Sequence, residues 1–279
     1  MNGTMKPAVI VLGATGTIGS HVVARAVADG RRVIAVGRNE GALAALRAQH
    51  GPRVTLQQAS ITRDADAATL AAALQRLPGP PPGAVIAAIR GATDAGRVLD
   101  APADFLRRRL DEDLIPHLVA ARHLLPLLAG QPRAGYVLVG GPGAAQPWAG
   151  YGHHSIGAAA LRMLARVLHE EARMLPVRVH LLAVDSPVRT AANATHACVQ
   201  WPDADAIAGH ALRLVDGAVP GDAALVRFPL GAAERPPGLS DDLDVGRVPC
   251  ADAQSHQDDA RALLRRIAAR PTSSQEFRS

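Results

Sequence analysis

Lysine is almost absent from this sequence: Lys6 is the only one among 279 residues, so nearly all of the 30 basic side chains are arginines. Because Lys6 precedes the first predicted strand, the folded body of the protein has no lysine for catalysis. Aromatic residues are also scarce, at 3%. With 48% hydrophobic residues, the core must be built mainly from alanine, valine, leucine and isoleucine, which suits helices packed closely on a sheet.

Further absences limit the class of protein. The two cysteines, Cys198 and Cys250, are too few for a disulfide framework and too far apart for a metal-ligand spacing. No run approaches the roughly 18 apolar residues of a membrane span, and no apolar signal region precedes the first strand. We therefore expect a cytoplasmic protein without a membrane partner.

The net charge of +5 does not indicate nucleic acid as a partner. The arginines are scattered among 25 carboxylates, and the short basic run at 107–109 is followed at once by an acidic run at 111–113. Such a mixture is typical of a solvated helix surface rather than of a basic binding patch. We expect no nucleic-acid partner.

Seven apolar segments alternate with segments of helical periodicity. The predicted strands are 8–12, 31–39, 53–60, 84–89, 135–141, 177–184 and 223–230, and the predicted helices are 20–30, 40–51, 65–76, 103–129, 155–174 and 203–215. This alternation indicates a parallel sheet covered on both faces, because right-handed crossovers place a helix layer on each side. We predict one doubly wound α/β domain over residues 1–232. A C-terminal extension follows at 233–279, with one helix at 257–269 and a flexible end.

The first predicted strand ends in the glycine turn GATGTIG, which leads into the first helix. Gly13 permits the tight turn, Gly16 lets the backbone approach a pyrophosphate, and Gly19 allows close packing of the helix on the strand. The start of the helix offers free N–H groups and the positive end of its dipole to phosphates. In this position the turn predicts a dinucleotide-binding Rossmann fold. The neighbouring residues expected at the cofactor are Thr15, Thr17 and Ile18.

The second predicted strand ends in Gly37-Arg38-Asn39, with no carboxylate before Glu40. Folds that bind NAD usually carry an acidic side chain here, which accepts hydrogen bonds from the ribose diol. An arginine can instead clamp a 2′-phosphate and stack on adenine. The sequence therefore predicts NADP rather than NAD as the cofactor, with a solvated turn arginine as the alternative.

Over residues 7–230 the chain resembles the short-chain dehydrogenase/reductase superfamily. The matching pieces are VLGATGTIG, VIAVGRN, GYVLVGG, AALRMLARVLHEEA and VRVHLLAV, together with the seven-strand order in a single domain. The resemblance implies a small-molecule carbonyl or alcohol substrate and a homo-oligomer, either a dimer or a tetramer. It also implies further contacts to the cofactor from Ser60, Ile61, Ala87, Ala88, Val188 and Thr190.

In that superfamily a Tyr-x-x-x-Lys pair, a serine and an asparagine carry out proton transfer, and all four positions differ here. Aligning the motifs places His154 at the tyrosine, Ala158 at the lysine, Gly141 at the serine and Asp113 at the asparagine. A shifted alignment makes Tyr151 the tyrosine, but a serine then occupies the lysine position. No alignment supplies the lysine, so the usual tyrosine–lysine mechanism is absent.

His153 and His154 do not form a metal site, because adjacent residues point to different sides and no further ligand lies at suitable spacing. His154 is a candidate acid or base, since imidazole has an unperturbed pKa of about 6.5. Asp113 is a candidate to orient the ring and favour its charged form. The alternative is that both histidines are ordinary polar residues at a helix entrance. Gly141 and Ala158 enlarge the cleft, which favours a bulky ligand or a vacated active site.

Three functions are open from the sequence. The first is an NADP(H)-dependent reductase or dehydrogenase in which His154, with Asp113 or Tyr151, replaces the tyrosine as proton donor. The second is a non-redox enzyme on the same scaffold, an isomerase, lyase or cyclase. The third is a non-catalytic NADP(H) sensor or partner subunit.

Overall fold

Strands and helices alternate along the chain in the computed structural model, which describes residues 6–91, 95–148, 150–191, 193–218 and 222–229. The strands are β1 (Val9–Leu12), β2 (Val33–Gly37), β3 (Val54–Gln58), β4 (Ala84–Ala87), β5 (Ala134–Val139), β6 (Val177–Ala183) and β7 (Leu225–Arg227). The helices are α1 (Thr17–Ala28), α2 (Glu40–His50), α3 (Asp64–Gln75), α4 (Ala103–Asp113), α5 (Ile115–Leu128), α6 (Gly152–Glu171) and α7 (Ala204–Val215). Three short 3₁₀ helices cover Gly51–Arg53, Val98–Asp100 and Ala172–Met174.

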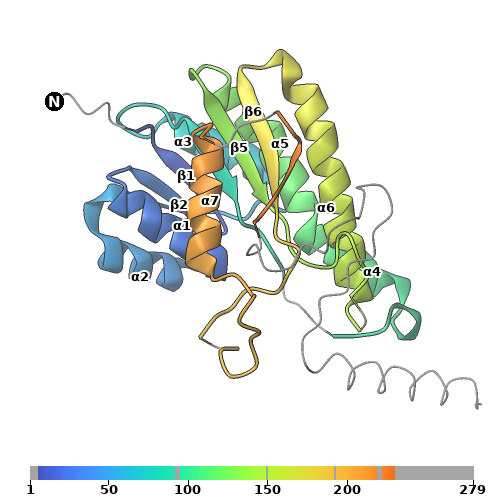
Figure 1. The fold of residues 1–279 in the computed structure, drawn as a ribbon. Helices are drawn as coiled ribbons and strands as arrows, with labels where there is room; N and C mark the ends of the chain where they lie inside the picture. Colours follow the sequence, from blue (N-terminus) through green and yellow to red (C-terminus); the bar gives the residue numbers. More distant parts are fainter. Residues whose placement is uncertain (1–5, 92–94, 149, 192, 219–221, 230–279) are drawn as a thin grey trace, which may run out of the picture. The chain divides into compact units, whose positions relative to one another are not determined.

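The seven strands form one parallel sheet with the order β3-β2-β1-β4-β5-β6-β7. The central strand β1 pairs with β2 on one side and β4 on the other, so that Val9 is opposite both Val33 and Ala84. Helices connect successive strands and cover the sheet (Figure 1). The predicted α/β, doubly wound Rossmann fold with a seven-stranded parallel sheet is confirmed.

Two hydrophobic clusters hold the helices on opposite faces of the sheet. Helices α1, α2 and α7 belong to one cluster, and α3, α5 and α6 belong to the other. Along β1, Val9 and Val11 join the first cluster, whereas Ile10 and Leu12 join the second. This division follows from the two-residue period of a strand, which points successive side chains to opposite faces. Because both faces are covered, the strand is apolar throughout.

The carboxyl edge of the sheet is where a ligand is expected. The strands after β1 lie first on one side, as β2 and β3, and then on the other, from β4 onward. Doubly wound sheets bind ligands at this change of direction, in the crevice outside the carboxyl ends of the strands. Since all strands are parallel, the segments that follow them emerge at the same edge.

Two helices differ from the predictions. The single helix predicted at 103–129 is wrong, because α4 and α5 are separated at Leu114. Pro116 in the first turn of α5 explains the break: proline lacks the N–H that would bond to the preceding turn, and its ring clashes with a carbonyl there. The helix predicted at 155–174 begins earlier, at Gly152, so that both histidines lie in its first turn.

The predictions for the end of the chain have different outcomes. The strand predicted at 223–230 is observed as the shorter β7. The predicted extension at 233–279 and its helix at 257–269 lie outside the described residues. Among the residues that the structure describes, no helix is both long enough and apolar enough to cross a membrane.

Candidate functional site

The glycine turn between β1 and α1 is sterically constrained. Gly13 has a φ angle of +73°, and a Cβ atom there would lie 2.4 Å from the carbonyl oxygen of Ala88. A Cβ atom on Gly19 would lie 2.1 Å from the carbonyl oxygen of Gly13. Neither position has room for a larger residue, and Gly13 also needs the backbone freedom of glycine. The turn therefore brings the start of α1 directly against the end of β1.

The start of α1 is open to an anion. Gly16 precedes the helix without a side-chain hydrogen bond, and the first turn contains no acidic residue. The N–H groups at a helix start have no partner within the helix, and the helix dipole favours negative charge there. Gly16, Thr17 and Ile18 line the cleft described next. This arrangement fits the pyrophosphate of a dinucleotide.

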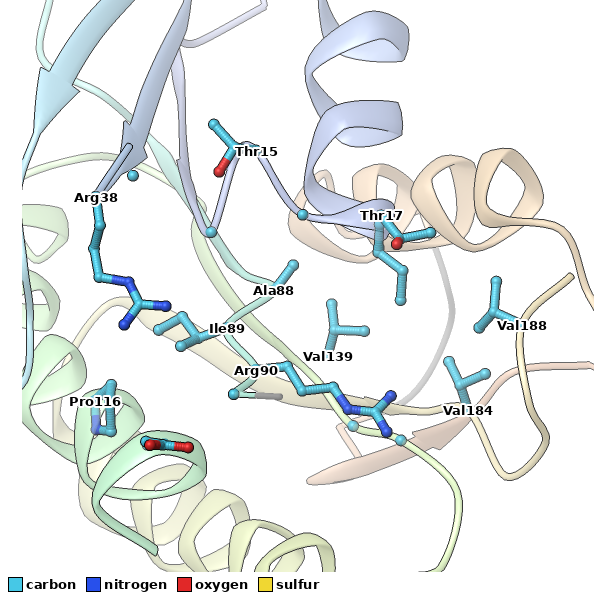
Figure 2. Close-up of a pocket in the computed structure, with 18 of the residues that line it drawn as sticks. Thr15, Thr17, Arg38, Ala88, Ile89, Arg90, Pro116, Val139, Val184 and Val188 are labelled. Carbon is cyan, nitrogen blue, oxygen red and sulfur yellow. The ribbon is translucent and has the colours of Figure 1, made fainter. Parts of the chain in front are cut away.

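A cleft of about 850 Å³ follows the carboxyl edge of the sheet, and its lining comes from the segments after β1 to β6 (Figure 2). This volume is typical of cofactor and ligand clefts. Gly19 and Ala87 are not part of the lining, because Gly19 packs on the turn and Ala87 is buried in β4. The predicted cofactor residues that do line the cleft are Gly13, Thr15, Gly16, Thr17, Ile18, Arg38, Ser60, Ile61, Ala88, Val188 and Thr190.

One end of the cleft carries Arg38, whose side chain extends from the end of β2 (Figure 2). The next residue, Asn39, caps α2 by accepting a hydrogen bond from the backbone N–H of Ala42 at 2.9 Å. The segment after β3 adds the hydroxyl groups of Ser60 and Thr62, which lie 3.2 Å apart. Among the described lining residues after β2 and β3 there is no carboxylate. The cation and hydroxyl groups suit a phosphate.

A second cavity, of about 30 Å³, shares part of its lining with the cleft. Its walls include His154, Ala158, Gly141 and Asp113. These are the four residues that the sequence alignment places at the tyrosine, lysine, serine and asparagine positions. They come from α6, the segment after β5 and the end of α4, and the structure brings them together around one small space.

His154 faces Arg90 across this cavity. The Arg90 Nη2 atom lies 3.2 Å from His154 Nε2. Arginine can only donate, so Nε2 accepts the hydrogen bond, and the imidazole is neutral with its proton on Nδ1. Burial lowers the pKa of His154 and the charge of Arg90 lowers it further, against the opposing effects of Asp113 and a hydrogen bond to the Pro142 backbone. The ring is therefore held neutral, and its Nε2 lone pair is engaged by Arg90.

Two contacts hold the segment that carries Arg90. Asp113 accepts a hydrogen bond from the backbone N–H of Gly91 at 2.6 Å. On the other side, His117 of α5 donates from Nε2 to the carbonyl oxygen of Ile89 at 3.2 Å. Asp113 was expected to orient the His154 ring. Among the described hydrogen bonds, however, that of Asp113 goes to the segment after β4 and not to this ring.

Tyr151 and His153 do not line either of the two cavities. His153 is buried, and its ring packs edge-on against Phe105 with 4.6 Å between ring centroids. Tyr151 immediately precedes α6, and its ring lies 4.7 Å from the ring of Trp148. Trp148 lines the cleft, so Tyr151 contacts a wall residue without lining the cleft itself.

Arg90 is the main residue that sequence reasoning missed. It directly follows the apolar strand predicted at 84–89, and a charged side chain just outside a buried parallel strand is a usable signal. Arg109 and Glu112 of α4 also line the cleft and form an ion pair at 3.0 Å. Their positions on a charged helix carried no comparable signal. Among the described residues there is no group of three or more histidine, cysteine, aspartate or glutamate side chains that could hold a metal ion.

The sequence model of one family, the short chain dehydrogenases, matches residues 7–197. The chain belongs to this family. Oxidoreduction with a nicotinamide dinucleotide is the general activity of short-chain dehydrogenases, and the cleft has the glycine turn that such a cofactor needs. Comparison with curated proteins finds no match.

Several solved structures share the fold. A short-chain type dehydrogenase/reductase from Mycobacterium ulcerans is 20% identical, with a TM-score of 0.69 and coverage of 80% of this chain and 88% of that one. The closed form of a serine dehydrogenase complexed with NADP+ is 18% identical, with a TM-score of 0.69 and coverage of 86% and 100%. An NADPH-bound short-chain oxidoreductase from Pseudomonas aeruginosa, described as containing an atypical catalytic center, is 18% identical, with a TM-score of 0.70 and coverage of 82% and 98%.

Proposed function

We propose that this short-chain dehydrogenase is an NADP(H)-dependent oxidoreductase that acts on a small-molecule carbonyl or alcohol, with His154 in place of the family tyrosine. One observation carries the proposal: a single cleft runs from Arg38, past the glycine turn, to the segment of Arg90 that contacts His154. Binding groups for a phosphorylated dinucleotide and a proton-transfer group are thus connected.

The preference for NADP rests on Arg38. Its side chain lines the cleft at the end of β2, where Asn39 is occupied as a helix cap. Arginine binds phosphate through paired N–H groups, whereas a ribose diol is usually held by a carboxylate. Two of the structures with the same fold hold NADP+ or NADPH.

The proposed chemistry follows from the neutral state of His154. Bound NADP(H) supplies or accepts the hydride. In the direction of alcohol oxidation, Nε2 of His154 takes the hydroxyl proton after Arg90 releases that nitrogen. The lowered pKa keeps the ring unprotonated and ready as a base at neutral pH. In the reverse direction the same ring returns the proton to the substrate oxygen.

The test is turnover of a panel of carbonyls and alcohols, followed by the absorbance of the nicotinamide. We expect His154→Gln to lower kcat by about a hundredfold or more, in line with the usual contribution of acid–base catalysis. His123→Gln is the matched control, because His123 lies on α5 outside the cleft lining and pairs with Asp64. An unchanged kcat in His154→Gln would refute the role of the histidine.

The two other functions give different results in the same assay. A non-redox enzyme on this scaffold would convert its substrate without any change in nicotinamide absorbance. A sensor or partner subunit would bind NADP(H) without turnover. Gly141 and Ala158, which lack functional groups at the cavity, are the features that agree with these alternatives.

A further inference from the structure

Among the described residues, Arg90 is a cation that forms no direct ion pair, and it lines the cleft beside His154. Its side chain extends from the segment after β4, past Val139 and toward Val184 (Figure 2). Its one described hydrogen bond joins Nη2 to the neutral His154 ring. None of the described ion pairs involves Arg90.

The other charged groups at this end of the cleft have partners. Arg109 pairs with Glu112 at 3.0 Å. One carboxylate oxygen of Asp113 accepts the 2.6 Å hydrogen bond from the backbone of Gly91. The charge of Asp113 raises the pKa of His154 and, against the effect of burial, that of Arg90, but Asp113 forms no described ion pair with Arg90. None of the described carboxylates therefore bonds directly to the Arg90 guanidinium, whose N–H groups remain accessible to a ligand.

The guanidinium faces a space left open by the sequence. Gly141 has no side chain, and a Cβ atom there would lie 3.8 Å from both Arg90 Nη1 and His154 Nε2. Both nitrogen atoms therefore border the position where the family has a serine. Apolar walls nearby come from Val139, Val184 and Val188 (Figure 2). A ligand at this point meets the Arg90 cation, the His154 imidazole, hydrocarbon and the Asp113 carboxylate, whose Oδ1 atom already accepts the hydrogen bond from Gly91.

We propose that the substrate carries a carboxylate, which the Arg90 guanidinium binds beside His154. The proposal rests on the function proposed above and names the class of its substrate. A planar guanidinium matches a carboxylate with two parallel N–H···O bonds. One arginine without a described ion pair matches one negative charge better than a dianionic phosphate, which needs several donors.

Carboxylate binding also explains how His154 becomes available. In the structure, the Nη2 atom of Arg90 occupies Nε2, the atom that must accept the substrate proton. A carboxylate competes for the same N–H group and draws the Arg90 guanidinium away from the His154 imidazole. Its negative charge also offsets that of Arg90, one of the causes of the lowered His154 pKa. Substrate binding and activation of the base are thereby linked.

The test uses two probes of equal shape, isobutyrate and the neutral isobutyramide. The protein is labelled with ¹³C at the histidine Cε1 atoms, and the pKa of His154 is measured by NMR with each probe, with and without NADP+. The His154→Gln variant assigns the signal. We expect isobutyrate to raise the pKa of His154 and isobutyramide to leave it unchanged, because only the carboxylate neutralises Arg90.

Two variants locate the effect. In Arg90→Gln we expect isobutyrate to bind about tenfold more weakly or worse, since a charged hydrogen bond of typical strength is lost. Arg122→Gln is the matched control, because Arg122 is an exposed arginine of α5 that pairs with Asp64 at 3.4 Å. This variant should respond like the wild type.

The proposal is overturned if isobutyrate leaves the His154 pKa unchanged, if isobutyramide has the same effect, or if Arg90→Gln responds like the wild type. A circular dichroism spectrum confirms that each variant is folded. Failure of the proposed function has a different signature: the protein would not bind NADPH in a separate titration, whatever the response to isobutyrate.

Discussion

Acid should destabilise the protein through His117, which lies on α5 with its side chain fully buried. Its Nε2 atom donates to the carbonyl oxygen of Ile89, whereas Nδ1 is buried and has no described hydrogen-bond partner. A second proton would therefore be placed on a buried nitrogen without an acceptor. Burial lowers the pKa of His117 to about 4, against an ordinary value of 6.5.

The sign and size of the effect follow from proton linkage. Between pH 6.5 and 4 the unfolded chain binds a proton at His117 that the folded protein does not bind, so the free energy of unfolding falls as the pH falls. At about 1.4 kcal/mol per pKa unit, the full loss is about 3 kcal/mol at pH 4. Above pH 6.5 this contribution is present in full.

The assay is urea unfolding of wild type and His117→Gln, followed by circular dichroism at several pH values from 7 to 4. The variant has no imidazole at this position, so it should lose about 3 kcal/mol less than the wild type across that range. His196→Gln, which removes an exposed histidine, should follow the wild type. An equal loss in wild type and His117→Gln would show that protonation of His117 is not the cause of the acid sensitivity.

Three further predictions concern packing and assembly. Gly19→Ala forces a Cβ to 2.1 Å from a carbonyl oxygen, so in urea unfolding it should lower the free energy of unfolding by about 2 kcal/mol, and in calorimetry it should abolish NADPH binding. Gly130→Ala, whose Cβ meets nothing within 4 Å, should have neither effect. Tyr136→Phe removes a buried hydroxyl without a described partner and should raise unfolding stability by up to about 1 kcal/mol; a loss would contradict this. Met163 is 55% exposed on the α6 face that also exposes Ile156 and Val167. Met163→Glu should dissociate the predicted oligomer in light scattering, and an unchanged mass would refute a role for this face.

Much of the fold could be predicted because its signals are local. The strands at the centre of the sheet are short apolar runs, as Val9–Leu12 shows, and the alternation with helices predicts a parallel sheet. The break between α4 and α5 had a local signal as well, Pro116, but the surrounding helical periodicity outweighed it. A proline in the first turn of a helix is well tolerated, so the pattern is compatible with a new helix start.

The site was predicted in part, since the family motifs specified positions but not their contacts. The alignment brought His154, Asp113 and Gly141 to one cavity, as the structure has them. It could not indicate that Arg90, from the segment after β4, reaches Nε2 of His154. That contact depends on the length of the arginine side chain and on the space at Gly141. Neither property produces a periodic pattern that could be recognised in the sequence. The pKa of His154 follows from this contact and from burial.

Calorimetric titration of the protein with NADPH and NADH measures whether the cleft prefers the phosphorylated cofactor. We expect wild type to bind NADPH more tightly than NADH. In Arg38→Gln the NADPH affinity should fall by about tenfold to a hundredfold while the NADH affinity is kept, because a charged phosphate contact contributes roughly 1.5–3 kcal/mol. Arg122→Gln should behave as the wild type. Equal affinity of wild type for the two nucleotides, or no binding of either, would contradict the account.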